Sequence, residues 1–496
     1  MRRLGRMALA GVLAGAIPLG MAASQPKPPA QGGPAPSQGD KFVQPPVAPA
    51  PAPPVDKFAQ PPASPAPSRS AAPPPPGEPA TIGRLRMLLG PDTALTYGKA
   101  EVIDPARGSV RLSDVTLERP DGHRITMEEL TLDGLREDGV DEATARDVVL
   151  READGGATIS RLRLAGLAVR RPPPGEVLKP DMLGFDTLRI ERLAATGDSE
   201  VGIAELTIED YGQGRTGRVT LSGLDIRTQE AGMLDRLRVG RLALRGIELA
   251  ATLAALVEKQ TPPQPTGGYA LEVEEVALSA GDKPLGSLGS LRMSGEGKGG
   301  AGTETGSVAL REIRVEPFPG LTDWLQSFGY QALVADLTAE SRYDRSTGRL
   351  DLTSLSLAAR DIGALGFSMV LDGVTPEAAE ARDLQAMRLV SLGLRYVDQS
   401  LYSRFVQEQA RETRQTEKQV RDQHAAMVEA MLTSPAKGGA LDGLRDAMLR
   451  FIRGEAKELE IAARPPQPLP LAELAGTPPQ DATAAQRMLG LSATAR

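Results

Sequence analysis

The side chains that most often perform acid–base or metal chemistry are scarce in this sequence. There are two histidines, His123 and His424, and no cysteine. His123 lies in a turn-like segment beside Gly122, and His424 lies in a polar stretch that we expect to be helical. No second histidine stands at metal-ligand spacing from either, so both are interpreted as surface residues, although a triad assembled in space stays open. The sequence predicts neither a metal site nor a cofactor.

Two short motifs resemble known binding or catalytic motifs. The glycine-rich run of residues 295–302 resembles a phosphate-binding loop, but such a loop must begin a helix, and residues 303–315 alternate like a strand. Residues 434–437 place a serine three positions before a lysine, yet Pro435 prevents the helical turn that serine–lysine enzymes need. We interpret the first motif as a hairpin loop and the second as a loop between helices.

Carboxylates are numerous, and two of them at a suitable separation could act as the acid and base of a glycosidase. On an alternating strand, however, polar positions simply form the solvated face. Aromatic residues are only 3% of the chain, so no aromatic-lined cleft is indicated beside them. We therefore predict no catalytic residue and keep an exported hydrolase as a third hypothesis. The carboxylates considered are Glu128, Glu129, Glu272, Glu274, Glu275 and Asp336.

Residues 1–23 have the features of a secretory signal peptide: three arginines, a short apolar run and a small-residue cleavage site. We predict export, most simply to the periplasm, with an uncleaved anchor as the alternative. Cleavage would remove three arginines and no acid, changing the formal net charge from −7 to −10. This acidic balance argues against nucleic-acid binding. No later apolar run is long enough for a transmembrane helix, so none is expected in the mature chain.

Residues 24–80 are rich in proline and alanine, a composition that cannot bury enough apolar surface to fold. The heptad at residues 40–46 recurs at residues 56–62 with one change. We interpret the segment as a linker that favours extended polyproline conformation. Alternatively, Phe42 and Phe58 bind an aromatic-lined groove on a partner.

The remainder of the chain is organised by a recurring phrase: apolar, any, apolar, any, glycine, apolar. Alternation with a period of two places the apolar side chains on one face of a strand and the polar ones on the other. The phrase and its turn clusters predict a mainly β protein, a long curled antiparallel sheet of repeated hairpins with C-terminal helices. The phrase occurs at residues 130–135, 162–167, 219–224, 242–247 and 369–374.

The predicted elements divide the chain into five parts. After the signal peptide and linker, residues 81–398 form the sheet domain, with a short helix at residues 319–328. Residues 399–476 form a helical segment with one returning strand, and residues 477–496 form a tail whose end is frayed. The helical segment begins at Ser400 with one long helix to about residue 433, polar in its middle, followed by an amphipathic helix at residues 440–453.

These strand phrases, the helix-rich C-terminal segment and the passage at residues 459–471 resemble large proteobacterial envelope proteins of AsmA-like or uncharacterised type. The resemblance covers about residues 95–475. It implies an elongated periplasmic sheet with an envelope-maintenance or lipid-handling role, and no catalytic residues to carry over. The chain departs from the AsmA-like pattern because it has a cleavable-looking signal and a linker where those proteins usually keep a membrane helix.

Our leading hypothesis is a non-enzymatic exported envelope protein that binds or conveys lipid, or another apolar ligand, along the apolar face of the sheet. The rival is an interaction scaffold that docks envelope proteins through its linker and its long polar helix. The first hypothesis depends on whether the C-terminal helices fill that face. The candidate face residues are Leu132, Leu164, Leu221, Leu244, Leu357 and Leu371.

Overall fold

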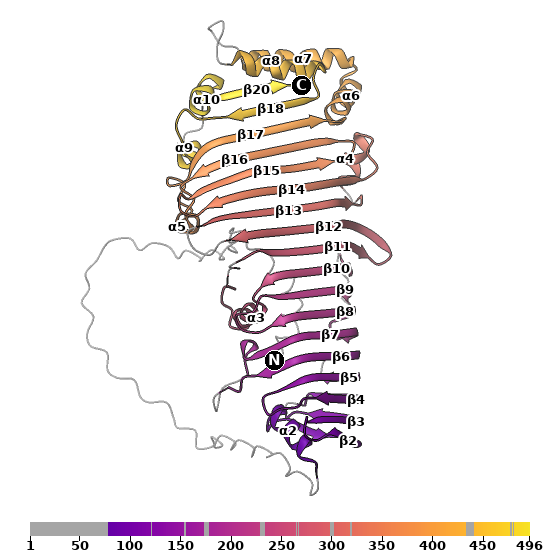
Figure 1. The fold of residues 1–496 in the computed structure, drawn as a ribbon. Helices are drawn as coiled ribbons and strands as arrows, with labels where there is room; N and C mark the ends of the chain where they lie inside the picture. Colours follow the sequence, from indigo (N-terminus) through magenta and orange to yellow (C-terminus); the bar gives the residue numbers. More distant parts are fainter. Residues whose placement is uncertain are drawn as a thin grey trace, which may run out of the picture.

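The computed structural model describes residues 78–120, 122–152, 155–172, 178–228, 234–263, 265, 267–297, 302–317, 320–432, 441–476, 479 and 481–496. The predicted signal peptide, the linker up to residue 77 and the Ser-Pro-Ala-Lys motif lie outside these residues. The described elements form an elongated ladder in which strands stack in chain order (Figure 1).

The 20 described strands form one sheet. From β3 to β17, each strand pairs antiparallel with its predecessor and its successor in the chain, while β1 and β2 both pair with β3, and β18 pairs with β17 and β20. The prediction of a long antiparallel sheet followed by C-terminal helices is confirmed. The strands are β1 (Ala94–Thr96), β2 (Lys99–Asp104), β3 (Ser109–Glu118), β4 (Arg124–Asp133), β5 (Gly139–Glu152), β6 (Gly155–Val169), β7 (Leu183–Thr196), β8 (Ser199–Tyr211), β9 (Gly217–Thr228), β10 (Arg236–Ile247), β11 (Tyr269–Ala280), β12 (Lys283–Gly297), β13 (Thr303–Val315), β14 (Leu333–Asp344), β15 (Arg349–Ala359), β16 (Gly363–Asp372), β17 (Arg388–Asp398), β18 (Glu458–Ala463), β19 (Leu469–Pro470) and β20 (Leu491–Ala495).

The helices of the described residues lie at the ends and along the margins of this sheet (Figure 1). They are α2 (Ala80–Leu89), the short 3₁₀ helix η1 (Pro180–Met182), α3 (Leu249–Val257), α4 (Leu321–Ser327), α5 (Pro376–Ala381), α6 (Leu401–Thr413), α7 (Glu417–Met431), α8 (Asp442–Arg453), α9 (Leu471–Gly476) and α10 (Ala482–Leu489).

Two rows of directly opposed apolar residues cross the sheet and form the floor of its apolar face. Residues that are opposed in a ladder lie on the same face, so the register alone assigns these rows. One row runs from Leu132 through Ala143, Leu164, Leu188, Ile208, Val219, Leu244, Leu271, Met293, Val308, Ala339, Leu355 and Phe367 to Leu394. The other runs from Leu130 through Ala145, Leu162, Ile190, Leu206, Leu221, Leu242, Val273, Leu291, Leu310, Leu337, Leu357 and Leu365 to Tyr396.

The glycine of the recurring phrase marks a kink at the edge of this floor. In all five copies its φ is positive, between 62° and 80°. At the kink, two consecutive residues point to the polar face. The spacing between successive apolar side chains therefore increases there from two residues to three. A polar face with an extra residue is longer than the apolar face, so the strand bends around the apolar face.

Most kinks use residues other than glycine. Positive φ values between 50° and 56° occur at Asp114, Asp147, Arg192, Asp210, Glu275 and Glu312, each followed by an apolar residue. Five of them, with Gly223, lie in β3, β5, β7, β9, β11 and β13 along one side of the floor. Asp210 lies in β8 and marks the other side of the floor, together with Gly134 directly after β4 and the phrase glycines of β6 and β10. The sheet therefore bends along both sides of its floor.

Apolar side chains of the floor and of the bent margins pack against each other. The central cluster contains Leu221 and Leu242 from the floor and Leu224 and Val239 from beyond the kink, all buried, and only Leu249 comes from a helix. Where the sheet bends, side chains from its margins cover the apolar side chains of its floor, so the face is buried without a helix on top of it. At the N-terminal end, by contrast, Ile82 of α2 packs into the cluster that covers β3 to β5.

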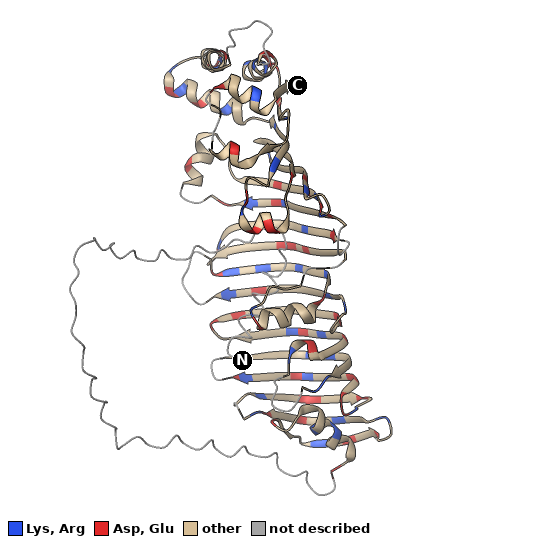
Figure 2. Cartoon of the chain, turned by 90° about the vertical axis from the view of Figure 1, so that its left-hand side faces the viewer, with Lys and Arg blue, Asp and Glu red and all other residues tan. Residues whose placement is uncertain are grey.

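The opposite face carries the charged residues. Figure 2 shows basic and acidic residues interspersed on strands along the whole length of the sheet. Cross-strand ion pairs join neighbours here, such as Arg189 with Glu205 at 3.2 Å and Arg395 with Glu458 at 2.8 Å. These pairs are solvated and contribute little individually to stability, although they fix which face is polar.

The structure corrects four expectations. The helix predicted from Ser400 to residue 433 is two helices, because Arg414 has φ 56° and ends α6, and Thr416 begins α7 with a capping box that uses Gln419. The rival hypothesis thus loses its long polar helix. β12 was not predicted, because its glycines hide the alternation. The tail is not frayed: β20 pairs with β18.

The fourth correction concerns the linker boundary. α2 begins at Ala80, inside the predicted linker, and Glu78 is already attached to the fold. The Glu78 carboxylate accepts hydrogen bonds from Arg86 at 2.9 and 3.1 Å and from the Tyr97 hydroxyl at 3.0 Å. These bonds lower the pKa of Glu78, with the bond from Arg86 the largest cause.

Candidate functional site

The six residues predicted to line an apolar face do lie on one face, but most of them are covered. Leu132, Leu221, Leu244 and Leu371 are buried in three separate clusters of the sheet, and Leu164 is half-buried. For these five positions, the apolar face is an ordinary core. Leu357 differs, because 44% of it is exposed.

Leu357 belongs to an exposed patch on the floor, which we call the open strip. Leu365 lies directly opposite Leu357 and is 45% exposed, and Leu394, one strand further along, is 38% exposed. Their half-buried floor neighbours are Leu337, Leu355 and Phe367. The strip thus extends over β14 to β17, next to the C-terminal helices.

The open strip begins where the row of positive-φ residues inside the strands ends. Glu312 in β13 is the last residue with positive φ inside a described strand before the margin of β16, and β14 and β15 have none between their ends. β15 keeps a bulge between Leu352 and Leu355, but it has no left-handed residue there. On the floor of β15 to β17, Leu357, Leu365 and Leu394 are exposed. On the floor of β9 to β11, Leu221, Leu242, Leu244 and Leu271 are buried.

Helices border the strip on three sides without covering it. Leu325 of α4 packs near Ala359 at one margin, and Leu471 of α9 packs near Leu371 at the other. At the C-terminal end, the ring of Phe451 in α8 contacts Tyr396 of the floor, with centroids 5.7 Å apart. The strip is an apolar surface with protein margins on these sides.

Sequence reasoning identified Leu357 but not Leu365 or Leu394. All three lie in alternating runs, so the pattern assigns their face correctly. The alternating pattern does not contain the exposed fraction of these side chains, which depends on how the surrounding strands and helices are arranged. The change from a positive-φ residue in β13 to none in β14 and β15 is visible only once the kinks have been recognised.

The two histidines lie near opposite ends of the molecule. His123 precedes β4, with Nδ1 3.2 Å from Glu152 Oε1. His424 lies in α7, with Nδ1 3.1 Å from the hydroxyl of Tyr402 and Nε2 3.0 Å from Gln409 Oε1. The structure therefore does not bring them together. Among the described residues, no group of three or more histidine or carboxylate side chains is placed to hold a metal ion.

One of the candidate carboxylates forms an unusual pair. Glu128 and Asp147 lie on adjacent strands at a row of kinks, and their carboxyl groups share a hydrogen bond, which raises the pKa of Glu128. Both side chains are exposed. Asp336 behaves oppositely, since the backbone N–H of Glu312 donates to it at 2.8 Å and Arg311 at 3.2 Å, which lowers its pKa.

The other carboxylates and the glycine run also lie on the polar face or in turns. Glu129 lies 3.9 Å from Arg111, and Glu275 is a kink residue. Glu272 and Glu274 are half-buried on β11. Residues 295–297 end β12, β13 follows from Thr303, and residues 298–301 lie outside the described residues.

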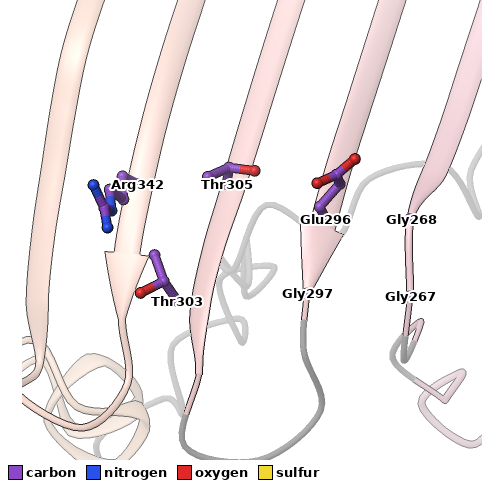
Figure 3. Close-up of a pocket in the computed structure, with 7 residues that line it drawn as sticks. All are labelled: Gly267, Gly268, Glu296, Gly297, Thr303, Thr305 and Arg342. Atoms are coloured by element: carbon purple, nitrogen blue, oxygen red, sulfur yellow. The ribbon is translucent and has the colours of Figure 1, made fainter.

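Two shallow depressions lie away from the open strip. One, of about 620 Å³, is lined by Gly267, Gly268, Glu296, Gly297, Thr303, Thr305 and Arg342 (Figure 3). Thr305 is opposed by Glu296 on one side and by Arg342 on the other, so these residues occupy a single polar row of three strands. The other, of about 450 Å³, lies over β8 to β11 and is lined mainly by charged residues and threonines.

The C-terminal part of the chain is similar to a protein family. A family model described only as "Uncharacterized protein" matches residues 356–496. This match covers less than a third of the chain. No curated protein matches the sequence. The matched segment begins one residue before Leu357, and it contains all three exposed leucines of the strip together with the C-terminal helices.

No helix among the described residues combines the length and apolarity needed to cross a membrane.

Proposed function

We propose that this chain is a non-enzymatic exported envelope protein that binds the acyl chain of a lipid, or a similar apolar ligand, on the open strip. The observation that carries the proposal is the exposure of Leu357, Leu365 and Leu394 on a floor whose other residues are buried or half-buried. The predicted signal peptide supports export, and the resemblance to AsmA-like proteins is consistent with it.

The size of the strip favours a slender ligand over a second protein. The floor of β14 to β17 spans about 15 Å across the strands, at roughly 4.8 Å per strand pair. Three leucines that are a little under half exposed offer roughly 2–4 kcal/mol on full burial, since a whole leucine contributes about 1.5–3 kcal/mol. A stable protein interface needs about 800 Å² from each partner, which is more than this patch supplies.

The proposal differs from the sequence-based hypothesis in one respect. A ligand conveyed along the whole sheet would need an open floor from end to end, but the floor of β9 to β11 is filled by its own side chains. The ligand is therefore bound at the C-terminal third of the sheet and is not carried along its length.

Trp324 offers a direct test, because it is the only tryptophan in the sequence and lies in α4 at the margin of the strip. We expect a dibrominated fatty acid to quench its fluorescence in a saturable manner in the full mature chain. Leu365→Glu should weaken this binding by about tenfold or more, because a charge is placed on the apolar floor.

Leu285→Glu is the matched control. Leu285 is 37% exposed in β12 and lies outside the strip, so its replacement should leave the quenching curve unchanged. The absence of saturable quenching, together with the absence of copurified lipid in a detergent-free preparation, would refute the proposal. Equal weakening by both variants would also contradict it.

A further inference from the structure

The C-terminal helices form a cap at the end of the sheet opposite to α2. α8 packs on the last strands, with Leu444 in the same cluster as Ile461 of β18 and with Ala447 close to Ala495 of β20. α7 packs on α6 through Val420 and on α8 through Ala425. The pair α7 and α8 thus lies at the extreme end of the described molecule in both views (Figures 1 and 2).

The outer surface of this cap carries an apolar patch made of Phe405, Met427 and Met431. Met431 is 69% exposed and Met427 is 57% exposed, more than any other large apolar side chain of the described residues, and Phe405 is 45% exposed. Met427 and Met431 are one helical turn apart on α7. Phe405 stacks on His424, one turn before Met427, with ring centroids 6.0 Å apart, so the patch is continuous.

The patch is held firmly on the sheet by a series of ring contacts. From Phe405 and His424, the series continues through Tyr402 to Phe451, with centroids 6.1 and 5.5 Å apart, and ends at Tyr396 of the floor. Aromatic contacts of this kind add to stability beyond the area that they bury. The exposed side chains are therefore carried on an ordered support.

The dimensions and charge of the cap limit what can cover the patch. Three side chains at the tip of an elongated molecule offer far less than the roughly 800 Å² per partner of a stable dimer. Residues 401–432 contain five basic and five acidic residues, so this surface has no net charge to attract nucleic acid or anionic lipid. Flexible methionines and an aromatic ring at a protruding helix suit insertion into the apolar boundary of a bilayer.

We propose that the patch of Phe405, Met427 and Met431 docks the C-terminal cap on the surface of a neutral phospholipid bilayer. The docking is shallow and reversible, because the apolar area is small compared with that of a lipid anchor. This inference goes beyond the proposed function, since it concerns a different surface and does not require the strip to bind a ligand. If the strip does bind an acyl chain, the docked bilayer lies at its C-terminal end.

Flotation with phosphatidylcholine vesicles at millimolar lipid tests the inference with the full mature chain. We expect the wild-type protein to float with the vesicles at low and at high salt alike. The double variant Met427→Glu/Met431→Glu should lose most of this binding, with a fall in the partition coefficient of about tenfold or more. Met87→Glu is the matched control, because Met87 is 46% exposed on α2 at the other end of the molecule.

Three results would overturn the inference. The first is a wild-type protein that does not float, or that floats only with anionic vesicles and is released by salt. The second is equal flotation of the wild type and the double variant. The third is a wild-type dimer in lipid-free sedimentation that the double variant abolishes, which would make the patch an interface between copies. Circular dichroism of both variants checks folding, and Leu365→Glu should float normally, so failure of docking is distinguishable from failure of the strip.

Discussion

Glu128 and Asp147 show how the kinks bring like charges together. Two consecutive residues point to the polar face at each kink, and where neighbouring strands both supply acids, their carboxyl groups meet. The hydrogen bond between them requires one proton, which is why the pKa of Glu128 is raised. The pair is on the exposed surface and serves no contact that we can identify.

The raised pKa of Glu128 predicts the direction of a pH effect. The folded state holds this proton more tightly than the unfolded state, so the associated stability is present below about pH 4.5 and is lost as the pH rises through the folded pKa. Glu128→Gln should therefore raise the urea midpoint relative to wild type at pH 7 more than at pH 4. Urea titrations at the two pH values measure this difference.

Asp225→Asn provides a control of opposite sign. The hydrogen bond from Arg236 is the largest cause of the lowered pKa of Asp225, so its stabilising effect is present above about pH 4 and is lost on acidification. This variant should lower the urea midpoint at pH 7. If both variants shift the midpoint in the same direction at pH 7, our account of the charge pairs is wrong.

At the scale of single elements, the kinks explain both what the sequence predicts and what it conceals. Alternation within the floor assigned most strands correctly, because floor residues obey a period of two. At the kink the spacing becomes three, and a positive-φ aspartate, glutamate or arginine resembles any polar residue, so only the glycine copies were recognised. The break between α6 and α7 had a readable signal in Thr416 and Gln419, the capping box.

Gly246 in β10 tests the structural importance of a kink. Its φ is 80°, and a Cβ there would overlap the carbonyl oxygen of Gly268. Gly246→Ala should destabilise the protein by about 2 kcal/mol or more, combining the cost of the left-handed conformation with displacement of backbone. Equilibrium unfolding in urea measures the change.

A second glycine, Gly90, allows the cost of the left-handed backbone conformation to be measured without the cost of a steric overlap. Its φ is 84°, but no atom lies within 4 Å of a Cβ placed there. Gly90→Ala should therefore cost only about 1–2 kcal/mol, from the backbone conformation alone. Equal losses in the two variants would mean that the contact with Gly268 is unimportant.

For the whole molecule, the sequence could predict the sheet but not which part of its face is open. Leu244 and Leu357 occur in similar alternating runs, yet one is buried and the other exposed. The difference arises from the bend of the sheet around them, which is a property of many strands together. No local pattern in β15 records that Glu312 of β13 is the last positive-φ residue inside a strand before the margin of β16.

This difference predicts an uneven stability along the sheet. Strands β9 to β11 share a buried cluster, whereas β14 to β17 border the open strip, and each strand contacts mainly its neighbours. Hydrogen exchange followed by mass spectrometry should show the slowest exchange in β9 to β11 and at least about tenfold faster exchange in β14 to β16. Uniform exchange along the sheet would contradict this expectation.

The pairing of strands in chain order also makes the molecule adjustable in length. Each hairpin adds about 10 Å along the stacking direction, at roughly 4.8 Å per strand, and it touches only the hairpins beside it. A hairpin could thus be gained or lost in the middle without altering α2 at one end or the cap at the other. The stack is about 80 Å long from β2 to β20, and this length is set by the number of its strands.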